Sequence, residues 1–281
     1  MTRLRLAILT TLTMITFAGN SLFCRMAMKE TSIDAATFTS VRLLSGAAML
    51  WMLMSLQRQS PLHHGSWRSA SALFIYAATL SFAYRSIDTG AGALMLFGAV
   101  QATMLIAGFI AGERMTRIQT AGFVSAMVGL VILVSPGVEA PSVLDSILML
   151  VSGIAWGVYS MLGRGQANPA AATAGNFLRA APMTVALSLL ALPWLRLDAQ
   201  GVLYAVLSGA VTSALGYVLW YRVIQHMQAI TASTVQLSAP VIAAIGGILM
   251  LGEVFTRNLL LSSVLTLGGI LLALRSGKTE L

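Results

Sequence analysis

Apolar runs of about 20 residues alternate with short polar connections along the entire chain. An α-helix rises about 1.5 Å per residue, so a run of this length crosses the hydrocarbon core of a bilayer. The pattern therefore predicts an all-α integral membrane protein with ten transmembrane helices. The spans are expected at about 5–25, 33–56, 68–86, 89–111, 118–135, 142–163, 171–192, 200–221, 229–251 and 257–275. The longest connection, QRQSPLHHGSW at 57–67, leaves no room for a soluble domain.

The composition agrees with this pattern. Of the 281 residues, 57% are hydrophobic and only 9% are charged, and the mean hydropathy is +0.84. Soluble domains carry about 25% charged residues, so this chain has too few polar residues to cover a water-soluble core. The net charge of +8 is explained by Lys and Arg that gather in cytoplasmic loops. No basic run contains interleaved aromatic residues, so the expected partner is the lipid bilayer and not a nucleic acid.

The distribution of Lys and Arg predicts that both termini are cytoplasmic. With the N-terminus inside, ten of these residues fall on the cytoplasmic side and five on the outer side, as the positive-inside rule requires. Residues 1–20 have the composition of a signal peptide, because Arg3 and Arg5 precede an apolar stretch. They are interpreted as the first helix, because the second half of the chain contains a counterpart.

Two similar hexapeptides, GERMTR at 112–117 and GEVFTR at 252–257, belong to a longer internal repeat. Four further pairs occur in the same order: FAGNSLFCR (17–25) with WGVYSMLGR (156–164), AATFTSVR (35–42) with AATAGNFLR (171–179), YRSI (84–87) with YRVI (221–224), and VGLVILV (128–134) with GGILLAL (268–274). The chain is thus predicted to contain two five-helix repeats, 1–137 and 138–281. The hexapeptides are expected to be structural turns, with Thr116 and Thr256 as N-caps of the following helices.

An odd number of helices per repeat has a consequence for topology. The second copy must enter the membrane from the opposite side, which gives an inverted repeat. Such repeats are typical of secondary transporters that hold their substrate near the midplane between the two halves.

These features resemble the drug/metabolite transporter superfamily. The resemblance is carried by the five-plus-five helices, the short connections, the GE-x-x-T-R-like turn after the fourth helix of each half, and an Arg in the second helix of each half (Arg42 and Arg179). More narrowly, the chain is similar to EamA-type members and, among these, to bacterial aromatic amino-acid exporters. The resemblance implies alternating-access export of amino acids, mainly aromatic and other apolar ones, across the bacterial inner membrane. A multidrug or other metabolite exporter of the same superfamily is the alternative.

Polar and aromatic residues near the middle of the spans are candidates for the substrate cavity, because polar groups at that depth usually face the interior of a bundle. The candidates are Phe17, Asn20, Tyr76, Gln101, Trp156, Tyr159, Gln236 and Pro240. Gln101 has a second interpretation as an interhelical hydrogen bond. Pro240 predicts a kink that frees backbone carbonyls or merely bends the helix, and each aromatic residue has packing as its alternative.

Arg42 and Arg179 occupy matching positions about a third of the way into their spans. Three roles are open to them: reaching towards an interface, pairing with helix-end carbonyls, or binding a substrate carboxylate. Their presence in both repeats favours a structural role common to the repeats.

Several kinds of chemistry are not expected. Cys24 is the single cysteine, and His63, His64 and His226 fall in or beside connections, so no metal, no cofactor and no enzymatic activity are predicted. The chain has no phosphate-binding GxxxxGK[ST] motif. All acidic residues are expected at span ends or in connections, which predicts weak or absent ion coupling; a passive channel is a further alternative. Small residues at 121–129 and 262–269 favour close helix packing, either between the repeats or in a homodimer.

Overall fold

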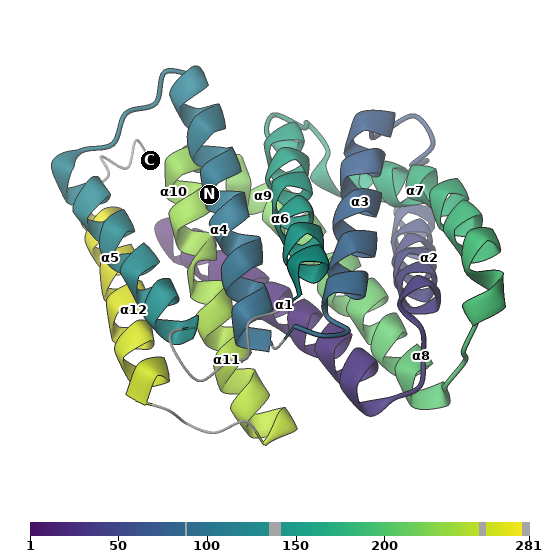
Figure 1. The fold of residues 1–281 in the computed structure, drawn as a ribbon. Coiled ribbons are helices and arrows are strands. Elements are labelled where there is room, and N and C mark those ends of the chain that lie inside the picture. The colour runs from purple at the N-terminus through teal and green to yellow at the C-terminus, as the bar shows by residue number, and fades with distance from the viewer. Residues whose placement is uncertain (88, 135–141, 253–256, 277–281) are drawn as a thin grey trace.

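The computed structural model describes residues 1–87, 89–134, 142–252 and 257–276. These residues form helices joined by short connections (Figure 1). The elements are α1 (Arg3–Glu30), α2 (Ala35–Leu56), α3 (Trp67–Ala83), α4 (Thr89–Ile110), α5 (Arg117–Val134), α6 (Val143–Gly163), α7 (Pro169–Ala191), η1 (Leu192–Trp194), α8 (Ala199–Val206), η2 (Leu207–Leu215), α9 (Gly216–Ile224), α10 (Ala229–Gln236), α11 (Ser238–Leu251) and α12 (Arg257–Ser276).

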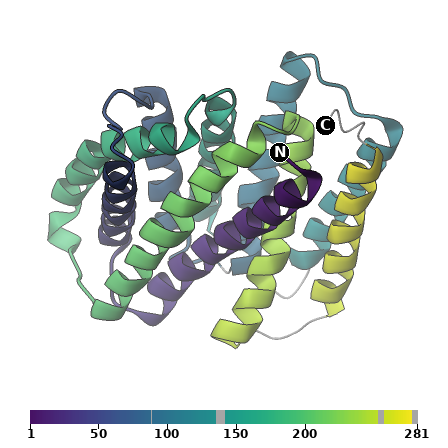
Figure 2. The same ribbon diagram turned by 180° about the vertical axis from the view of Figure 1, so that it is seen from behind.

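The predicted set of ten helices is confirmed in the part of the chain that the structure describes. Helices α8, η2 and α9 follow one another without a break over Ala199–Ile224, and α10 and α11 are separated only by Leu237. Each predicted span therefore coincides with one helix or one such run. The largest difference is at α1, which has 28 residues and a length of about 42 Å. Figure 2 shows it running obliquely across the back of the bundle beside α8 and α9.

The exposed side of α1 shows why the bundle belongs in a membrane. Leu4, Ile8, Leu12 and Ile15 follow one another at helical spacing and are between 46% and 72% exposed, whereas the amide of Asn20 faces inward and is buried. Apolar residues outside and polar residues inside are the reverse of a soluble helix. Six helical segments of the described chain are long and apolar enough to cross a membrane: 3–30, 35–56, 143–163, 169–194, 199–224 and 229–251. The protein is a multi-pass membrane protein.

Helices from the first and second halves of the chain interleave. Helix α5 packs along α12 at one edge of the bundle, and α2 packs along α7 at the other (Figure 1). Between these pairs, α6 lies against α3 and α4, and α1 lies against α9 and α11. The centre of the molecule is therefore built by both halves together.

Small residues bring α5 and α12 into close contact. The Ser125 hydroxyl donates to the Leu265 carbonyl oxygen at 3.1 Å, and a Cβ at Gly269 would overlap the carbonyl oxygen of Gly122. Packing between the two halves is thus the role observed for these small residues within the chain.

Side-chain caps explain where several helices begin. Asp34 caps α2 by accepting the Thr37 amide at 2.9 Å, and it also accepts the Arg196 amide at 2.9 Å. Burial raises the pKa of the Asp34 carboxyl, but hydrogen bonds from Thr37 and from the Arg196, Thr37 and Ala36 amides outweigh burial, so the pKa lies below its usual value. The charged carboxylate thus fixes the start of α2 to the connection before α8.

Two of the spans are irregular at their centres. Helix α10 ends at Gln236, four residues before Pro240, as expected because a proline ring clashes with the carbonyl four residues earlier. The ninth span is thus interrupted at Leu237, three residues before Pro240, where the sequence predicted a kink. Element η2 is a π-helix of nine residues that directs Ser208 and Ser213 into the core. Local π-helical turns are frequent at functional sites.

Close contact between α4 and α6 gives a stability prediction. A Cβ at Gly153 of α6 would overlap the Leu96 carbonyl oxygen, whereas a Cβ at Gly98 of α4 would meet no atom within 4 Å. We expect Gly153→Ala to lower the unfolding temperature in detergent, because overpacking costs about 1–3 kcal/mol. Gly98→Ala is the matched control and should leave the temperature unchanged or raise it, because Ala favours helix. Equal unfolding temperatures for the two variants would contradict the packing described here.

Candidate functional site

A small cavity lies where α1, α3, α4 and α6 meet. It is lined by Phe17, Ser21, Tyr76, Leu96, Phe97 and Trp156, and its volume is about 10 Å³. A cavity of this size holds about one water molecule. An amino-acid-sized ligand would require the surrounding helices to separate.

Trp156 of α6 is the centre of an aromatic cluster around this cavity. Its ring lies 5.0 Å from Phe17 in an edge-to-face arrangement, and 4.9 Å from Tyr76 and 4.7 Å from Tyr217 in tilted arrangements, as measured between ring centroids. Tyr159 lies 5.5 Å away on the same helix. Offset and edge-to-face contacts of this kind contribute beyond simple burial. The cluster thus joins α1, α3, α6 and α9 in one apolar wall.

The indole N–H of Trp156 connects this wall to the broken ninth span. It donates to the Gln236 side-chain oxygen at 2.8 Å, and the Gln236 amide nitrogen lies 3.1 Å from the Met104 sulfur of α4. Gln236 is the last residue of α10. The hydrogen bond therefore fixes α6 against the point at which α10 ends.

Asn20 of α1 organises a polar cluster beside the aromatic one. Its amide nitrogen donates to the Tyr76 hydroxyl at 2.7 Å and to the Tyr217 hydroxyl at 3.2 Å. Its amide oxygen accepts from Ser208 at 2.6 Å and from Ser213 at 3.4 Å. Both hydrogens and both lone-pair directions of one buried amide are thus used. This side chain ties α1 to α3, η2 and α9.

Arg42 of α2 reaches the same polar cluster. Its Nη2 donates to the Tyr217 hydroxyl at 2.9 Å and its Nε donates to the Ser213 hydroxyl at 3.2 Å. The guanidinium carbon lies 5.1 Å from the centre of the Tyr76 ring, within the range of a cation–π contact. The arginine is fully buried.

Arg179 has different surroundings. It is part-exposed on α7 and donates to the backbone carbonyls of Leu62 at 2.9 Å, of His64 at 2.5 Å and of Gly175 at 3.0 Å. Its role is to hold the connection between α2 and α3. The expectation of one structural role common to both arginines is therefore wrong, because only Arg42 reaches the core.

The structure brings together six of the eight candidate residues: Phe17, Asn20, Tyr76, Trp156, Tyr159 and Gln236. The other two lie nearby in the bundle without joining this cluster. Gln101 donates to the Ser233 carbonyl oxygen of α10, which is the interhelical bond weighed as its alternative. Pro240 is buried near the start of α11.

Several members of the site were not predicted from the sequence: Ser21, Leu96 and Phe97 of the cavity wall, and Tyr217, Ser208 and Ser213 of the polar cluster. A signal for Ser208 and Ser213 was present, because small hydroxyl residues recur inside an otherwise apolar run at 208–213. Tyr217 lies near the expected end of its span, and its position in the core depends on the added turn of η2.

The first hexapeptide turn has a more specific role than a simple connection. Gly112 follows α4 with a φ of +86°, and Gly252 follows α11 with a φ of +64°, which explains the shared glycine because this conformation favours a residue without Cβ. Thr116 accepts the Gln119 amide at 3.2 Å, and Gln119 accepts the Thr116 amide at 2.9 Å. This capping box confirms Thr116 as an N-cap of α5. Thr256 lies outside the described residues.

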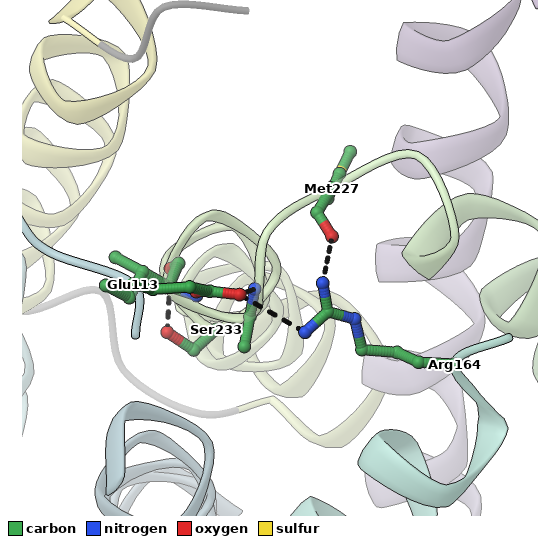
Figure 3. Close-up of polar contacts among 6 residues, drawn as sticks. Glu113, Arg164, Met227 and Ser233 are labelled. Atoms are coloured by element: carbon green, nitrogen blue, oxygen red, sulfur yellow. Dashed lines mark hydrogen bonds and ion pairs between the residues drawn. The ribbon is translucent and has the colours of Figure 1, made fainter. Parts of the chain in front are cut away.

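Glu113 fastens this turn to the second half of the chain (Figure 3). Its carboxylate accepts the backbone amides of Ala229 and Ile230, each at 3.0 Å, and these are the first two residues of α10. It also forms an ion pair with Arg164 at 3.2 Å. A carboxylate at a helix N-terminus is favoured by the helix dipole.

Arg164 completes the contact from the end of α6. Its Nη2 donates to the Met227 carbonyl oxygen at 3.2 Å, just before α10 begins (Figure 3). Glu113, Arg164 and the start of α10 therefore form a latch that holds three helices together at one end of the bundle. The sequence predicted a structural turn here, but it did not identify this contact between the halves.

The histidines and the described acidic residues lie at helix ends or in connections, where the sequence predicts them. His63, His64 and His226 are exposed in or beside connections. The acidic residues of the described chain lie at helix ends or in connections: Glu30, Asp34, Glu113, Asp145 and Asp198. A closed, partly polar centre inside an apolar helical bundle is typical of a membrane transporter.

Comparison with known proteins defines the family. A model described as the EamA-like transporter family matches residues 144–275. The Pseudomonas aeruginosa protein PA1977 is 50% identical, with 96% of this chain and 94% of that protein covered. The Bacillus subtilis protein YoaV, described as an uncharacterized transporter, is 25% identical over 85% of this chain and 86% of its own length.

A solved crystal structure shares the fold. It superposes with a TM-score of 0.76 at 18% sequence identity, and covers 94% of this chain and 98% of the other. Together with the sequence relatives, this makes the protein a multi-pass membrane transporter and not an enzyme. The chain belongs to the EamA-like transporter family, within the drug/metabolite transporter superfamily.

The latch gives a prediction about local opening. We expect Glu113→Gln to raise the rate of amide hydrogen exchange at Ala229–Thr231, because hydrogen bonds to a charged acceptor contribute about 1.5–3 kcal/mol. Mass spectrometry of the protein in detergent measures the exchange. Glu30→Gln, at the exposed end of α1, is the matched control and should change nothing at α10. Unchanged exchange in Glu113→Gln would mean that the carboxylate does not hold this helix start.

Proposed function

We propose that this protein exports amino acids, mainly aromatic and other apolar ones, across the bacterial inner membrane by alternating access. The observation that carries the proposal is the closed cavity between the aromatic rings of Phe17, Tyr76 and Trp156, with walls from both halves of the chain. The amides of Asn20 and Gln236 are hydrogen-bonded to two of these rings, behind the cavity wall. Pockets with apolar and aromatic walls and a few placed polar groups suit a ligand with an apolar side chain and a polar head. Phe17, Tyr76 and Trp156 would contact the side chain.

The contacts between helices support an inverted repeat with halves 1–137 and 138–281. The repeat equates α1 with α6, α3 with the run from α8 to α9, and α4 with the run from α10 to α11. Helix α6 packs on α3 and α4, and correspondingly α1 packs on α8, α9 and α11. The pairs α2 with α7 and α5 with α12 each join a helix to its own counterpart. The first helix of each half thus packs on helices of the other half, which is the pattern that a two-fold axis between the repeats produces.

The latch at Glu113 supports a closed state at one end of the transporter. The Lys and Arg bias supports a cytoplasmic position for this end and for both termini. In alternating access the latch would open when the cavity is accessible from the cytoplasm and close when it is accessible from outside. Its few hydrogen bonds and one ion pair suit a contact that must break in each cycle.

A transport assay tests the proposed substrate. We expect protein-loaded liposomes to show saturable counterflow of tryptophan, phenylalanine or tyrosine, and no counterflow of nucleotide sugars or cationic drugs. Saturation would exclude a passive channel. Counterflow of cationic drugs without any amino acid would instead identify the alternative, a multidrug exporter of the same superfamily.

Variants at the cavity test its location. We expect Trp156→Ala to reduce counterflow at least tenfold, because the ring that contacts four aromatic neighbours is lost. Trp156→Phe, which keeps a ring but removes the bond to Gln236, should have an intermediate effect. Trp51→Ala is the matched control, since Trp51 is 45% exposed on α2. Wild-type transport by folded, monodisperse Trp156→Ala would place the substrate elsewhere.

The positions of the described carboxylates support transport with little or no proton coupling. Proton relays in transporters usually contain acidic or histidine side chains within the membrane, whereas those described here lie at helix ends or in connections. Export would then follow the substrate gradient. We expect the same uptake rate in liposomes with and without a pH gradient of two units. A severalfold dependence on that gradient would contradict this mechanism.

A further inference from the structure

Arg42 is a buried cation without an anionic partner. Its side chain, on α2, is fully buried, and no carboxylate of the described residues forms an ion pair with it. Its hydrogen-bond partners are the neutral hydroxyls of Tyr217 and Ser213. Its Nη1 has no hydrogen-bond partner among the described residues.

These contacts stabilise the charge of Arg42 only in part. A charge removed from water is stabilised when it is paired and when its remaining hydrogens are bonded. Hydroxyls and one aromatic face reduce the desolvation penalty of Arg42 but do not neutralise its charge. An unpaired ionisable side chain at this depth usually marks a ligand or ion site.

The neighbours of Arg42 connect it to the cavity. Tyr76 lines the cavity and also lies under the guanidinium. Tyr217 accepts a hydrogen bond from Arg42 and packs against Trp156. Arg42 is therefore one side chain away from the cavity, and a shift of the Tyr76 ring would open the path between them.

We propose that Arg42 binds the carboxylate of the transported substrate. This inference rests on the proposed function and deepens it. It requires a carboxylate on the substrate and excludes substrates that carry only a positive charge. When the helices separate, Nη1 and Nη2 present a planar fork that matches a carboxylate. The hydroxyls of Tyr76 and Tyr217 are further donors, and the aromatic cluster contacts the apolar end of the substrate. Lys at this position would keep the charge but lose the fork.

Paired ligands test the proposal independently of turnover. Thermal stabilisation of the purified protein in detergent is measured with L-tryptophan, L-tryptophan amide, tryptamine, 3-indolepropionate and inorganic phosphate. We expect both carboxylates to bind at least tenfold more tightly than the amide and tryptamine. Phosphate, which has no apolar part for the aromatic wall, should not stabilise the protein.

Variants show whether Arg42 causes this preference. Arg42→Gln should bring the ratio of carboxylate to amide affinity close to one, and Arg42→Lys should keep a reduced preference. A purely structural role for Arg42 would lower both affinities and leave their ratio unchanged. Arg222→Gln, at the exposed end of α9, is the control and should keep the wild-type ratio.

The outcomes separate this inference from the proposed function. Equal binding of tryptophan and its amide by the wild type, or a preference that survives Arg42→Gln, would overturn the role of Arg42 while leaving amino-acid transport in place. Binding of 3-indolepropionate but not of tryptophan, dependent on Arg42, would uphold the carboxylate site and reject amino acids as substrates. If no carboxylate stabilises the protein, the inference is wrong.

Discussion

Polar groups in the middle of this bundle depend on the protein for their hydrogen-bond partners, because hydrocarbon supplies none. Asn20 shows how far this constraint reaches. One amide side chain satisfies itself with two tyrosine hydroxyls and two serine hydroxyls from α3, η2 and α9. A one-residue rotation of α1 would break all four bonds at once. The hydrogen bonds of a single residue thus fix the register of several helices, which apolar packing against equally apolar lipid would leave weakly defined.

The same constraint accounts for the irregular helices. A π-helical turn rotates the residues that follow it, and η2 places Ser208, Ser213 and Tyr217 on the same inward side. Pro240 ends α10 at Gln236, so that the side chain of Gln236 meets the indole of Trp156. Both departures from regular helix occur beside the polar cluster.

Sequence reasoning succeeded where a physical signal is local. The length of apolar runs predicted the ten spans, the proline predicted the break in the ninth span, and the threonine of the first hexapeptide predicted the cap of α5. It also identified most of the central cluster, because a Trp or an Asn at mid-span is unusual in lipid. Contacts between segments that are distant in the sequence could not be predicted, because no local pattern of residues indicates them. Nothing in the spacing of Glu113 indicates that it caps a helix 116 residues later.

Arg42 and Arg179 are a second example of environments that could not be predicted from the sequence. The sequence alignment of the two halves predicts matching places for them, yet Arg179 meets the carbonyls of the connection between α2 and α3. Arg42 instead meets hydroxyl groups in the core. A repeat predicts equivalent backbone positions. It does not predict equivalent environments.

In the proposed alternating-access mechanism, the central cluster and the latch must differ in strength. The cluster combines aromatic contacts with hydrogen bonds that no solvent can replace, so it keeps its helices together unless a ligand compensates for their separation. The latch lies at the end of the bundle, where Arg164 is 29% exposed, and water competes for its groups. A net contribution of about 1.4 kcal/mol from the latch would shift the balance between closed and open ends about tenfold. In the proposed mechanism, a difference of this size favours the closed end and is small enough for that end to open in each cycle.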